Sequence, residues 1–244
     1  MAKGETTTTL PPKWTDDPLS EFANHAFRNM LATFVRKSPQ FNVLVELDRY
    51  YFNIASNLVN PTDILAPLFL MRSHSAYRAG CQLACGGQIV ESFCVLRSCL
   101  EFALYGLHIY INESLGEVWL QRHDDADSLR TVKKEFTHVK VINTLRNEDR
   151  QLFESVELLY KRTIDFGGHP NERAITGSML MESSDAQILL QQIYLHADDL
   201  SLDHGMKTAA QVGLRSLYIL RRIFRERFDI LDITSGLDRL SKQL

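Results

Sequence analysis

Four polar side chains surround the abrupt end of one predicted helix, in the stretch YKRTIDFGGHPNE at residues 160–172: Arg162, Asp165, His169 and Asn171. Arg162, Asp165 and His169 are spaced by three and four residues, so on a continuous helix they would share a face. Arginine can stabilise the charge of a phosphorane-like transition state, and histidine can move protons near neutral pH. Arg162 and His169 are therefore candidate catalytic residues. The alternative is a helix end and turn in which His169 is hydrogen-bonded to a carboxylate.

The residues next to His169 define how the chain must turn. We expect Gly167 to end the helix with a positive φ, and Gly168 to permit the close approach of another chain or a phosphate. The proline at position 170 disfavours helical backbone at His169 and predicts an extended conformation there. Asn171 is then placed to cap whatever follows.

A second polar pair, Arg97 and Glu101, lies one helical turn apart beside a predicted core stripe. Arginine before glutamate is the less favourable order for an ion pair within one helix. We therefore expect a partly buried cluster in which each group reaches a further partner, with Tyr160 as a member. Two interpretations stay open: a salt bridge between helices, or a cluster that binds a ligand or nucleic acid. We also expect Arg97, Glu101 and His169 to meet in space.

The spacing of potential metal ligands argues against a metal centre. Glu135 and His138 form one E-x-x-H motif, but a di-iron bundle needs a second copy and two further glutamates. The cysteines lack zinc-site spacing, and we interpret them as small packed apolar residues: Cys81, Cys85, Cys94 and Cys99. The sequence thus predicts no metal and no cofactor.

Charge and hydropathy restrict the class of protein. The chain has 244 residues and a net charge of −3, so as a whole it is not a polyanion binder. It contains no uninterrupted apolar run of the length that a membrane span needs, and its N-terminus lacks the apolar core of a signal peptide. We expect a cytoplasmic protein without a membrane segment. One basic group near the C-terminus is either a solvated helix end or a phosphate-contacting rim: Arg221, Arg222, Arg225 and Arg227.

Apolar residues recur at three and four along most of the chain, which predicts an all-α multi-helix bundle. We expect a disordered head at 1–16, an N-terminal helical arm at 17–62 and a bundle domain at 63–244. Within the bundle, the glycines at 86 and 87 should separate two antiparallel helices. Residues 112–127 are expected to be a connection and 170–183 irregular. A helix is expected from 185 and a last long helix through 210–228, with no strands.

The hairpin at 72–101 and the later YKRTIDFGGHPN resemble the HEPN-type helical bundles of prokaryotes, in particular an uncharacterised bacterial branch. The shared features are a Gly-Gln turn, the R-x-x-x-E helix and a final H-P-N motif. The resemblance covers roughly residues 63–171. It implies a symmetric homodimer in which an R-x6-H motif, here Arg162 to His169, faces its copy across an RNA cleft. It also implies metal-independent cleavage with the RNA 2′-hydroxyl as nucleophile.

One departure from that family decides between two functions. Active members carry Asn, Asp or His directly after the arginine, whereas this chain has Thr163. We therefore expect a dimeric module, non-catalytic or weakly catalytic, that binds RNA, a nucleotide or a protein partner in a bacterial defence or stress context. The alternative is a metal-independent, RNA-cleaving toxin or defence endoribonuclease that uses Arg162 and His169.

Overall fold

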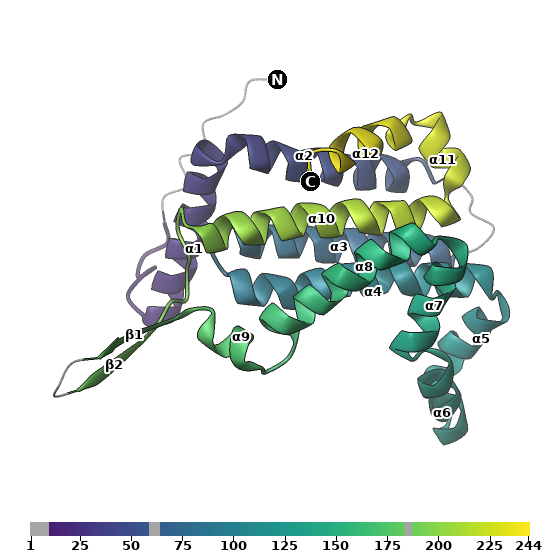
Figure 1. Cartoon of the computed structure of the whole chain (residues 1–244), viewed down its shortest axis with the longest axis horizontal. Helices are drawn as coiled ribbons and strands as arrows, with labels where there is room; N and C mark the ends of the chain where they lie inside the picture. The colour runs from purple at the N-terminus through teal and green to yellow at the C-terminus, as the bar shows by residue number, and fades with distance from the viewer. Residues whose placement is uncertain (1–9, 59–63, 184–186) are drawn as a thin grey trace.

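The computed structural model of this chain describes residues 10–58, 64–183 and 187–244, and it confirms the all-α fold class. Helices make up 77% of it, beside one small two-stranded sheet. Part of the expected head, residues 1–9, and part of the expected arm, residues 59–62, lie outside the described residues. The helices form a bundle along which the longest elements run side by side (Figure 1).

Three long helices build the centre of the bundle: α3 (Leu65–Cys85), α4 (Ile89–Ile111) and α10 (Leu200–Ile223). Each packs against the other two, and α2 (Ser38–Ser56) packs on α3 and α10. Their buried faces form one apolar core, whose largest fully buried side chains include Tyr51, Tyr77, Phe93, Leu100 and Leu107. Burial of such apolar area is the main term that stabilises the fold.

The predicted turn between α3 and α4 is confirmed. Gly87 has a φ of 90°, a left-handed conformation that favours glycine. A Cβ atom at this position would lie 2.2 Å from the main-chain oxygen of His196, whose own N–H donates to the Gly87 carbonyl at 2.9 Å. The glycine therefore serves two needs at once, the reversal of the chain and the close approach of a distant segment.

The N-terminal helix α1 (Pro18–Arg36) begins where the sequence predicts. The Asp17 side chain accepts hydrogen bonds from the N–H groups of Leu19 and Ser20, each at 3.0 Å. This cap satisfies two of the four free N–H groups of the first turn. Unlike α2, α1 contributes almost nothing to the core, since its buried residues are Asn24 and Thr33 alone.

Beyond the centre, several short helices replace longer predicted elements. The expected connection at 112–127 contains α5 (Ser114–Leu120) and a 3-10 turn, and the following segment divides into α6 (Ala126–Glu135) and α7 (His138–Glu148). The last long helix starts earlier than expected, runs through His204 and Gly205, and ends at Ile223. Two short helices then fold back, α11 (Arg225–Ile230) and α12 (Ile233–Ser241).

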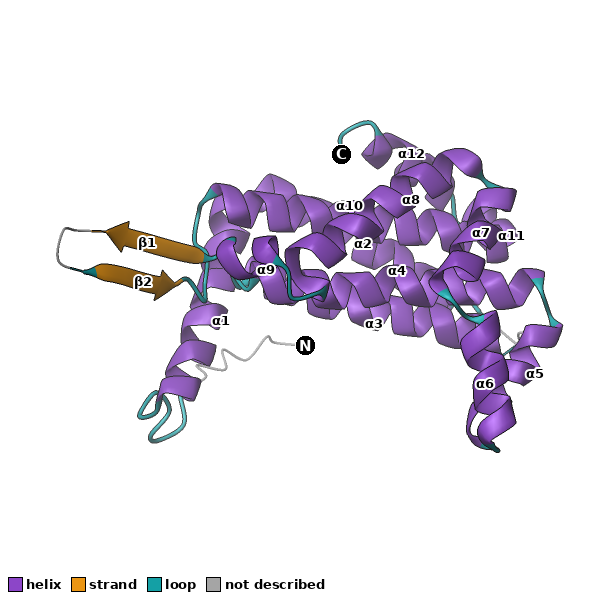
Figure 2. Ribbon diagram, turned by 60° about the horizontal axis from the view of Figure 1, so that its bottom comes forward, coloured by secondary structure: helices purple, strands orange, loops and turns teal. Residues whose placement is uncertain are grey.

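A β-hairpin occupies the region where the sequence predicts irregular chain and then a helix. Strand β1 (Met179–Ser183) pairs antiparallel with β2 (Ile188–Gln192), and both figures show the hairpin projecting from the bundle (Figures 1 and 2). The expected helix from 185 is therefore wrong, as is the expected absence of strands. Pairing with β1 satisfies the N–H and C=O groups of β2 that face it, whereas those on the outer edge point away from the two-stranded sheet.

Helix α4 is also long and apolar enough, by length and composition, to cross a membrane. Its most apolar window has a mean hydropathy of 1.3, and half of that window is buried inside the bundle. The helix packs against α3, α10 and α7. Its apolar composition is thus explained by its place in the core, while the cytoplasmic location stays a prediction.

Candidate functional site

The two residues of the R-x-x-x-E motif meet Tyr160 and His138 at the junction of α4, α7 and α8 (Arg150–Thr163). Arg97 Nε lies 3.2 Å from Glu101 Oε1, and the Tyr160 hydroxyl donates to the same oxygen at 2.9 Å. The His138 ring stacks on the Tyr160 ring with 4.0 Å between centroids and 13° between planes. We call these four residues the Glu101 cluster.

Two members of the Glu101 cluster, Tyr160 and His138, are neutral near pH 7. Burial and the nearby Glu101 carboxylate raise the pKa of Tyr160 to about 12, so its hydroxyl stays protonated and donates. Burial lowers the pKa of His138, which keeps that ring neutral although Glu101 acts in the opposite direction. The cavity beside the cluster measures about 50 Å³, which suits a water molecule rather than an organic ligand.

Arg162 lies on another face of α8 and is directed at α10. Its Nη1 donates to Gln211 Oε1 at 2.7 Å and lies 3.4 Å from the hydroxyl of Thr208. Gln211 in turn donates to the main-chain oxygen of Leu244 at 2.9 Å. No carboxylate of the described residues lies within 4.0 Å of this guanidinium, whose pKa burial lowers. Arg162 therefore carries a half-buried charge that only neutral groups solvate.

The chain leaves α8 through a π-helical turn (Ile164–Gly168), and here one expectation is wrong. Gly167 does not adopt a positive φ; its role is the approach to α4. A Cβ at Gly167 would lie 2.2 Å from the Val90 carbonyl oxygen and 2.9 Å from Phe93 Cβ. The thiol of Cys94 donates to the Gly167 oxygen at 3.0 Å. The wider π turn places the Gly167 backbone against α4 and does not end the helix with a left-handed glycine.

The H-P-N motif follows this turn, and its backbone is as predicted. His169 is extended, with φ −146° and ψ 139°, and its side chain is exposed. Asn171 caps α9 (Glu172–Thr176), accepting from the Ala174 N–H at 2.9 Å. Asp165 lies 4.0 Å from Arg173. No side-chain hydrogen bond, ion pair or ring contact joins His169 to Arg97, Glu101, Arg162 or another of the described residues.

Sequence reasoning missed His204, which lies between the π turn and α4. Its ring centroid is 5.7 Å from that of Phe93 and 5.5 Å from that of Phe166. Burial, followed by the positive charges of Arg162 and Lys207, lowers the pKa of His204. The helical spacing of α10 could have indicated this residue, because His204 lies one turn before Thr208 and two turns before Gln211 on the same helix face.

Sequence reasoning also missed a buried serine and histidine, in line with an exposed aspartate, at the base of the hairpin. Ser178 Oγ lies 3.1 Å from His196 Nε2, and His196 Nδ1 lies 2.8 Å from Asp199 Oδ2. Ser178 and His196 are each only 4% exposed, and Asp199 also caps α10 through the Leu202 N–H. A nucleophile must reach its substrate, so this arrangement serves to fix the hairpin base to α10.

Potential metal ligands are dispersed. Within the described ranges, no three His, Cys, Asp or Glu side chains are close enough to hold an ion. The four cysteines are free, and burial raises the pKa of Cys85 to about 12, which disfavours the thiolate.

Comparison with known proteins adds no evidence about function. No protein-family model, curated protein or solved structure matches the chain. The HEPN-like assignment stays a prediction that rests on the residues quoted above.

Proposed function

We propose that this chain is a non-catalytic, HEPN-like helical-bundle protein that acts as a homodimer and binds an anionic partner, RNA or a nucleotide. The observation that carries the proposal is the environment of Arg162. Its guanidinium is held by Gln211 and Thr208, while His169 stands exposed on a separate turn. Cleavage of RNA would need an arginine and a proton-transferring histidine on one phosphate.

The unbalanced charge of Arg162 supports the anionic partner. Removing an arginine from water without a carboxylate is unfavourable, and hydrogen bonds to neutral groups offset only part of that cost. A phosphate group would complete the compensation, because guanidinium and phosphate form short, charge-assisted hydrogen bonds. The same geometry therefore favours binding and gives no support to proton transfer.

An exposed apolar surface at one end of the bundle supports the dimer. We call it the arm surface, and it consists of large side chains of α1 and of one face of the hairpin, each between 50% and 76% exposed: Leu19, Phe27, Leu31, Phe34, Val35, Met181, Ile188 and Leu190. The Phe22 and Tyr194 rings, 6.5 Å apart, join the two parts. Contiguous apolar surface of this kind marks interaction sites, and a second copy offers a matching one.

The first experiment tests catalysis. Purified protein is incubated with end-labelled RNA oligonucleotides and a chelator, and host growth is followed during expression. We expect intact RNA and unchanged growth for the wild type and for a double variant with Arg162→Ala and His169→Ala. Cleavage or growth arrest that the double variant abolishes would establish the alternative, a metal-independent endoribonuclease that uses these two residues.

A second experiment tests assembly and binding. Light scattering at micromolar concentration should give the mass of a dimer, and fluorescence anisotropy should detect binding of labelled RNA or of a labelled nucleotide. Arg162→Gln should weaken that binding without changing the mass. A monomeric mass would contradict the dimer, and binding that is insensitive to Arg162→Gln would contradict the role given to this residue.

A further inference from the structure

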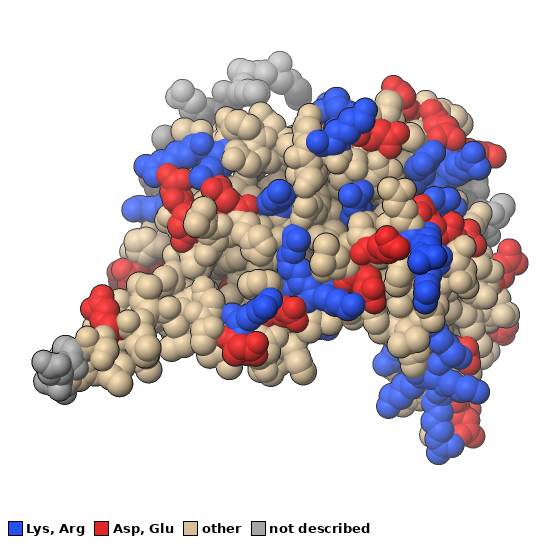
Figure 3. All heavy atoms as spheres, in the orientation of Figure 1, with Lys and Arg blue, Asp and Glu red and all other residues tan. Residues whose placement is uncertain are grey.

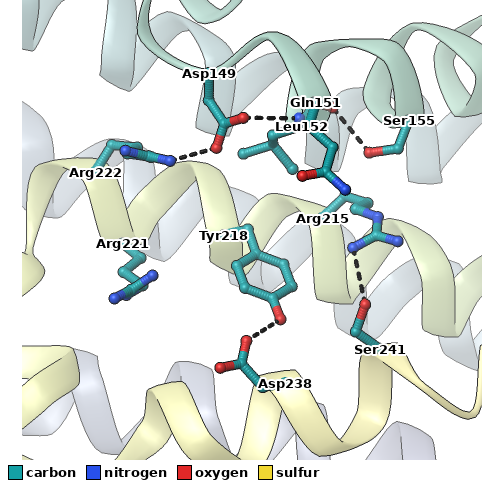
Figure 4. Close-up of a pocket in the computed structure, with 10 residues that line it drawn as sticks. All are labelled: Asp149, Gln151, Leu152, Ser155, Arg215, Tyr218, Arg221, Arg222, Asp238 and Ser241. Carbon is teal, nitrogen blue, oxygen red and sulfur yellow. Dashed lines mark hydrogen bonds and ion pairs between the residues drawn. The ribbon is translucent and has the colours of Figure 1, made fainter.

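A polar cavity of about 370 Å³ lies between α8, α10 and α12 (Figure 4). Its volume is within the range of about 300–1,000 Å³ that small-molecule sites occupy. Three arginines of α10 line it, Arg215 on one side of Tyr218 and Arg221 and Arg222 on the other. This concentration of guanidinium groups on one helix is the feature that needs an explanation.

The three arginines differ in how their charges are balanced. Arg222 forms an ion pair with Asp149, which is itself the cap of α8. Arg221 Nη2 lies 4.0 Å from Asp229, and the buried Nε of Arg221 has no hydrogen-bond partner within the described part of the chain. Arg215 has no carboxylate of the described residues within 4.0 Å; its polar contact is with the hydroxyl of Ser241 at 3.4 Å. Two of the three therefore have donor capacity left over.

The carboxylates that line the cavity are already engaged. Asp149 accepts from Arg222 and from the Leu152 N–H at 3.0 Å. Asp238 accepts from the Tyr218 hydroxyl at 2.7 Å, and burial together with this carboxylate raises the pKa of Tyr218 to about 12. Neither aspartate lies within ion-pair distance of Arg215. The lining of the cavity thus carries three arginines against two aspartates, both of which are already engaged.

Neutral hydrogen-bonding groups and an aromatic face complete the lining. Gln151 and Ser155 enter from α8 and Ser241 from α12. The Arg215 guanidinium carbon lies 5.7 Å from the centroid of the Tyr218 ring, a cation–π arrangement that orients the guanidinium. A planar, oriented arginine can bind phosphate through two parallel hydrogen bonds, which a lysine cannot do.

We propose that this cavity binds the phosphate groups of a small ligand of the size of a nucleoside triphosphate, with Arg215 at one end of the site and Arg221 at the other as the phosphate-binding residues. Arg222 stays paired with Asp149 and holds the wall of the site in place. The neutral groups of α8 and α12 are available to the rest of the ligand. The site does not depend on the dimer or on His169, and it is distinct from the Gln211 and Thr208 contacts of Arg162, which lie one and two turns earlier on α10.

Calorimetric titration of the full chain with three probes tests the proposal: ATP, inorganic phosphate and a 5′-phosphorylated RNA oligonucleotide. We expect ATP to bind, and inorganic phosphate to bind more weakly and compete with it. Arg215→Gln and Arg221→Gln should each weaken ATP binding at least tenfold, about 1.4 kcal/mol. The matched control is Arg150→Gln, an exposed arginine of α8 outside the cavity, which should bind like the wild type.

Two variants guard against a folding artefact, because Arg215 is the more buried of the pair. If Arg215→Gln fails to fold, the Arg221→Gln result decides. Absence of ATP and phosphate binding at millimolar concentration would overturn the proposal, as would unchanged affinity in a folded variant. Binding of the RNA alone, insensitive to both variants, would also overturn it and place the anion site elsewhere. Loss of RNA binding in Arg162→Gln with ATP binding intact would leave this proposal standing and separate it from the function proposed above.

Discussion

At the residue scale, the site residues divide into those with partners and those without. Tyr160 and Glu101 satisfy each other, and Arg97 completes the pair. The His169 side chain is exposed and has no polar partner among the described residues. An exposed side chain without partners contributes little to folding.

Gly167 provides the sharpest residue-scale prediction. Alanine at this position would place a Cβ 2.2 Å from a main-chain oxygen of α4, so either the π turn or α4 must move. We expect Gly167→Ala to reduce the free energy of unfolding by about 1–3 kcal/mol, the usual cost of overpacking. Chemical denaturation measures this value.

Two controls accompany Gly167→Ala. His169→Ala, two residues away and exposed, should change stability by less than about 0.5 kcal/mol. Gly116→Ala should also be mild, because its added Cβ meets the end of the Leu65 side chain at 3.1 Å rather than backbone. If His169→Ala were the most destabilising of the three, the histidine would be a structural residue of the turn.

The sequence predicted local features better than contacts. The Asp17 cap, the glycine turn at 86–87, the extended His169 and the Asn171 cap follow from the residues themselves and are confirmed. The direction of Arg162 towards α10 could not be predicted, because it depends on how α8 packs. Gly167 illustrates the limit: its sequence indicated a special backbone position, but helix ends and close approaches both need glycine.

At the element scale, the β-hairpin is the part of the fold that the sequence did not predict. The residues ILLQQ at 188–192 have good helix propensity, and only pairing with β1 makes them a strand. An isolated two-stranded hairpin is marginally stable in water. Each large apolar side chain of this hairpin is at least 46% exposed, except Met179 at its base. In the view of Figure 3 the projecting hairpin shows few charged side chains.

The hairpin therefore yields a prediction about assembly. Met181 and Leu190 are direct cross-strand partners, 71% and 59% exposed. We expect the double variant Met181→Lys with Leu190→Lys to convert the dimer to a monomer, because two charges would be desolvated in the interface. Its thermal midpoint, measured at a concentration where the wild type is monomeric, should be nearly unchanged. Light scattering and thermal melts provide the two readouts.

The opposite face of the same hairpin supplies the control. Gln191→Lys adds a lysine next to these positions but points to the other side of the sheet, since neighbouring strand residues alternate. It should leave the dimer intact. Persistence of the dimer in the double variant would show that the arm surface is not the interface.

At the scale of the whole molecule, one core joins helices from both ends of the sequence, and polar groups are distributed around it. Tyr51, Ser73, Cys99 and Ser216 form a buried polar network at its centre, where α2, α3, α4 and α10 meet. Such a network rigidifies a core when its members are satisfied. Its members are far apart in the sequence, which is why periodicity predicted the helices but not the contacts among them.

Histidine burial gives a prediction for the whole molecule. Burial is the largest cause that lowers the pKa of four histidines below the ordinary 6.5: His74, His108, His138 and His204. The unfolded chain then binds more protons than the folded chain below that pH, so stability is present above about pH 6.5 and is lost as pH falls through it. We expect the free energy of unfolding to decrease between about pH 7.5 and pH 5.5.

The carboxylates affect the free energy of unfolding in a separate and lower pH range. Interactions with neighbouring positive charges keep the pKa of Asp48 and Glu46 below the ordinary values, so their contribution is lost only below about pH 4.5. His204 tests the assignment most directly, since no acidic group opposes the lowering of its pKa by burial, Arg162 and Lys207. His204→Phe keeps the aromatic contacts with Phe93 and Phe166 and removes one titrating group.

The slope of stability against pH in His204→Phe should therefore be shallower between about pH 7.5 and pH 5.5. One proton fewer corresponds to at most about 1.4 kcal/mol per pH unit. Urea denaturation at a series of pH values, with thermal melts as a second readout, measures the slope. The control is Leu158→Phe, which adds an aromatic ring at an exposed position of α8 and removes no titrating group, so its slope should match that of the wild type. Equal slopes for His204→Phe and the wild type would mean that His204 titrates alike in the folded and unfolded chain, which its position between two phenylalanine rings and beside Arg162 makes unfavourable.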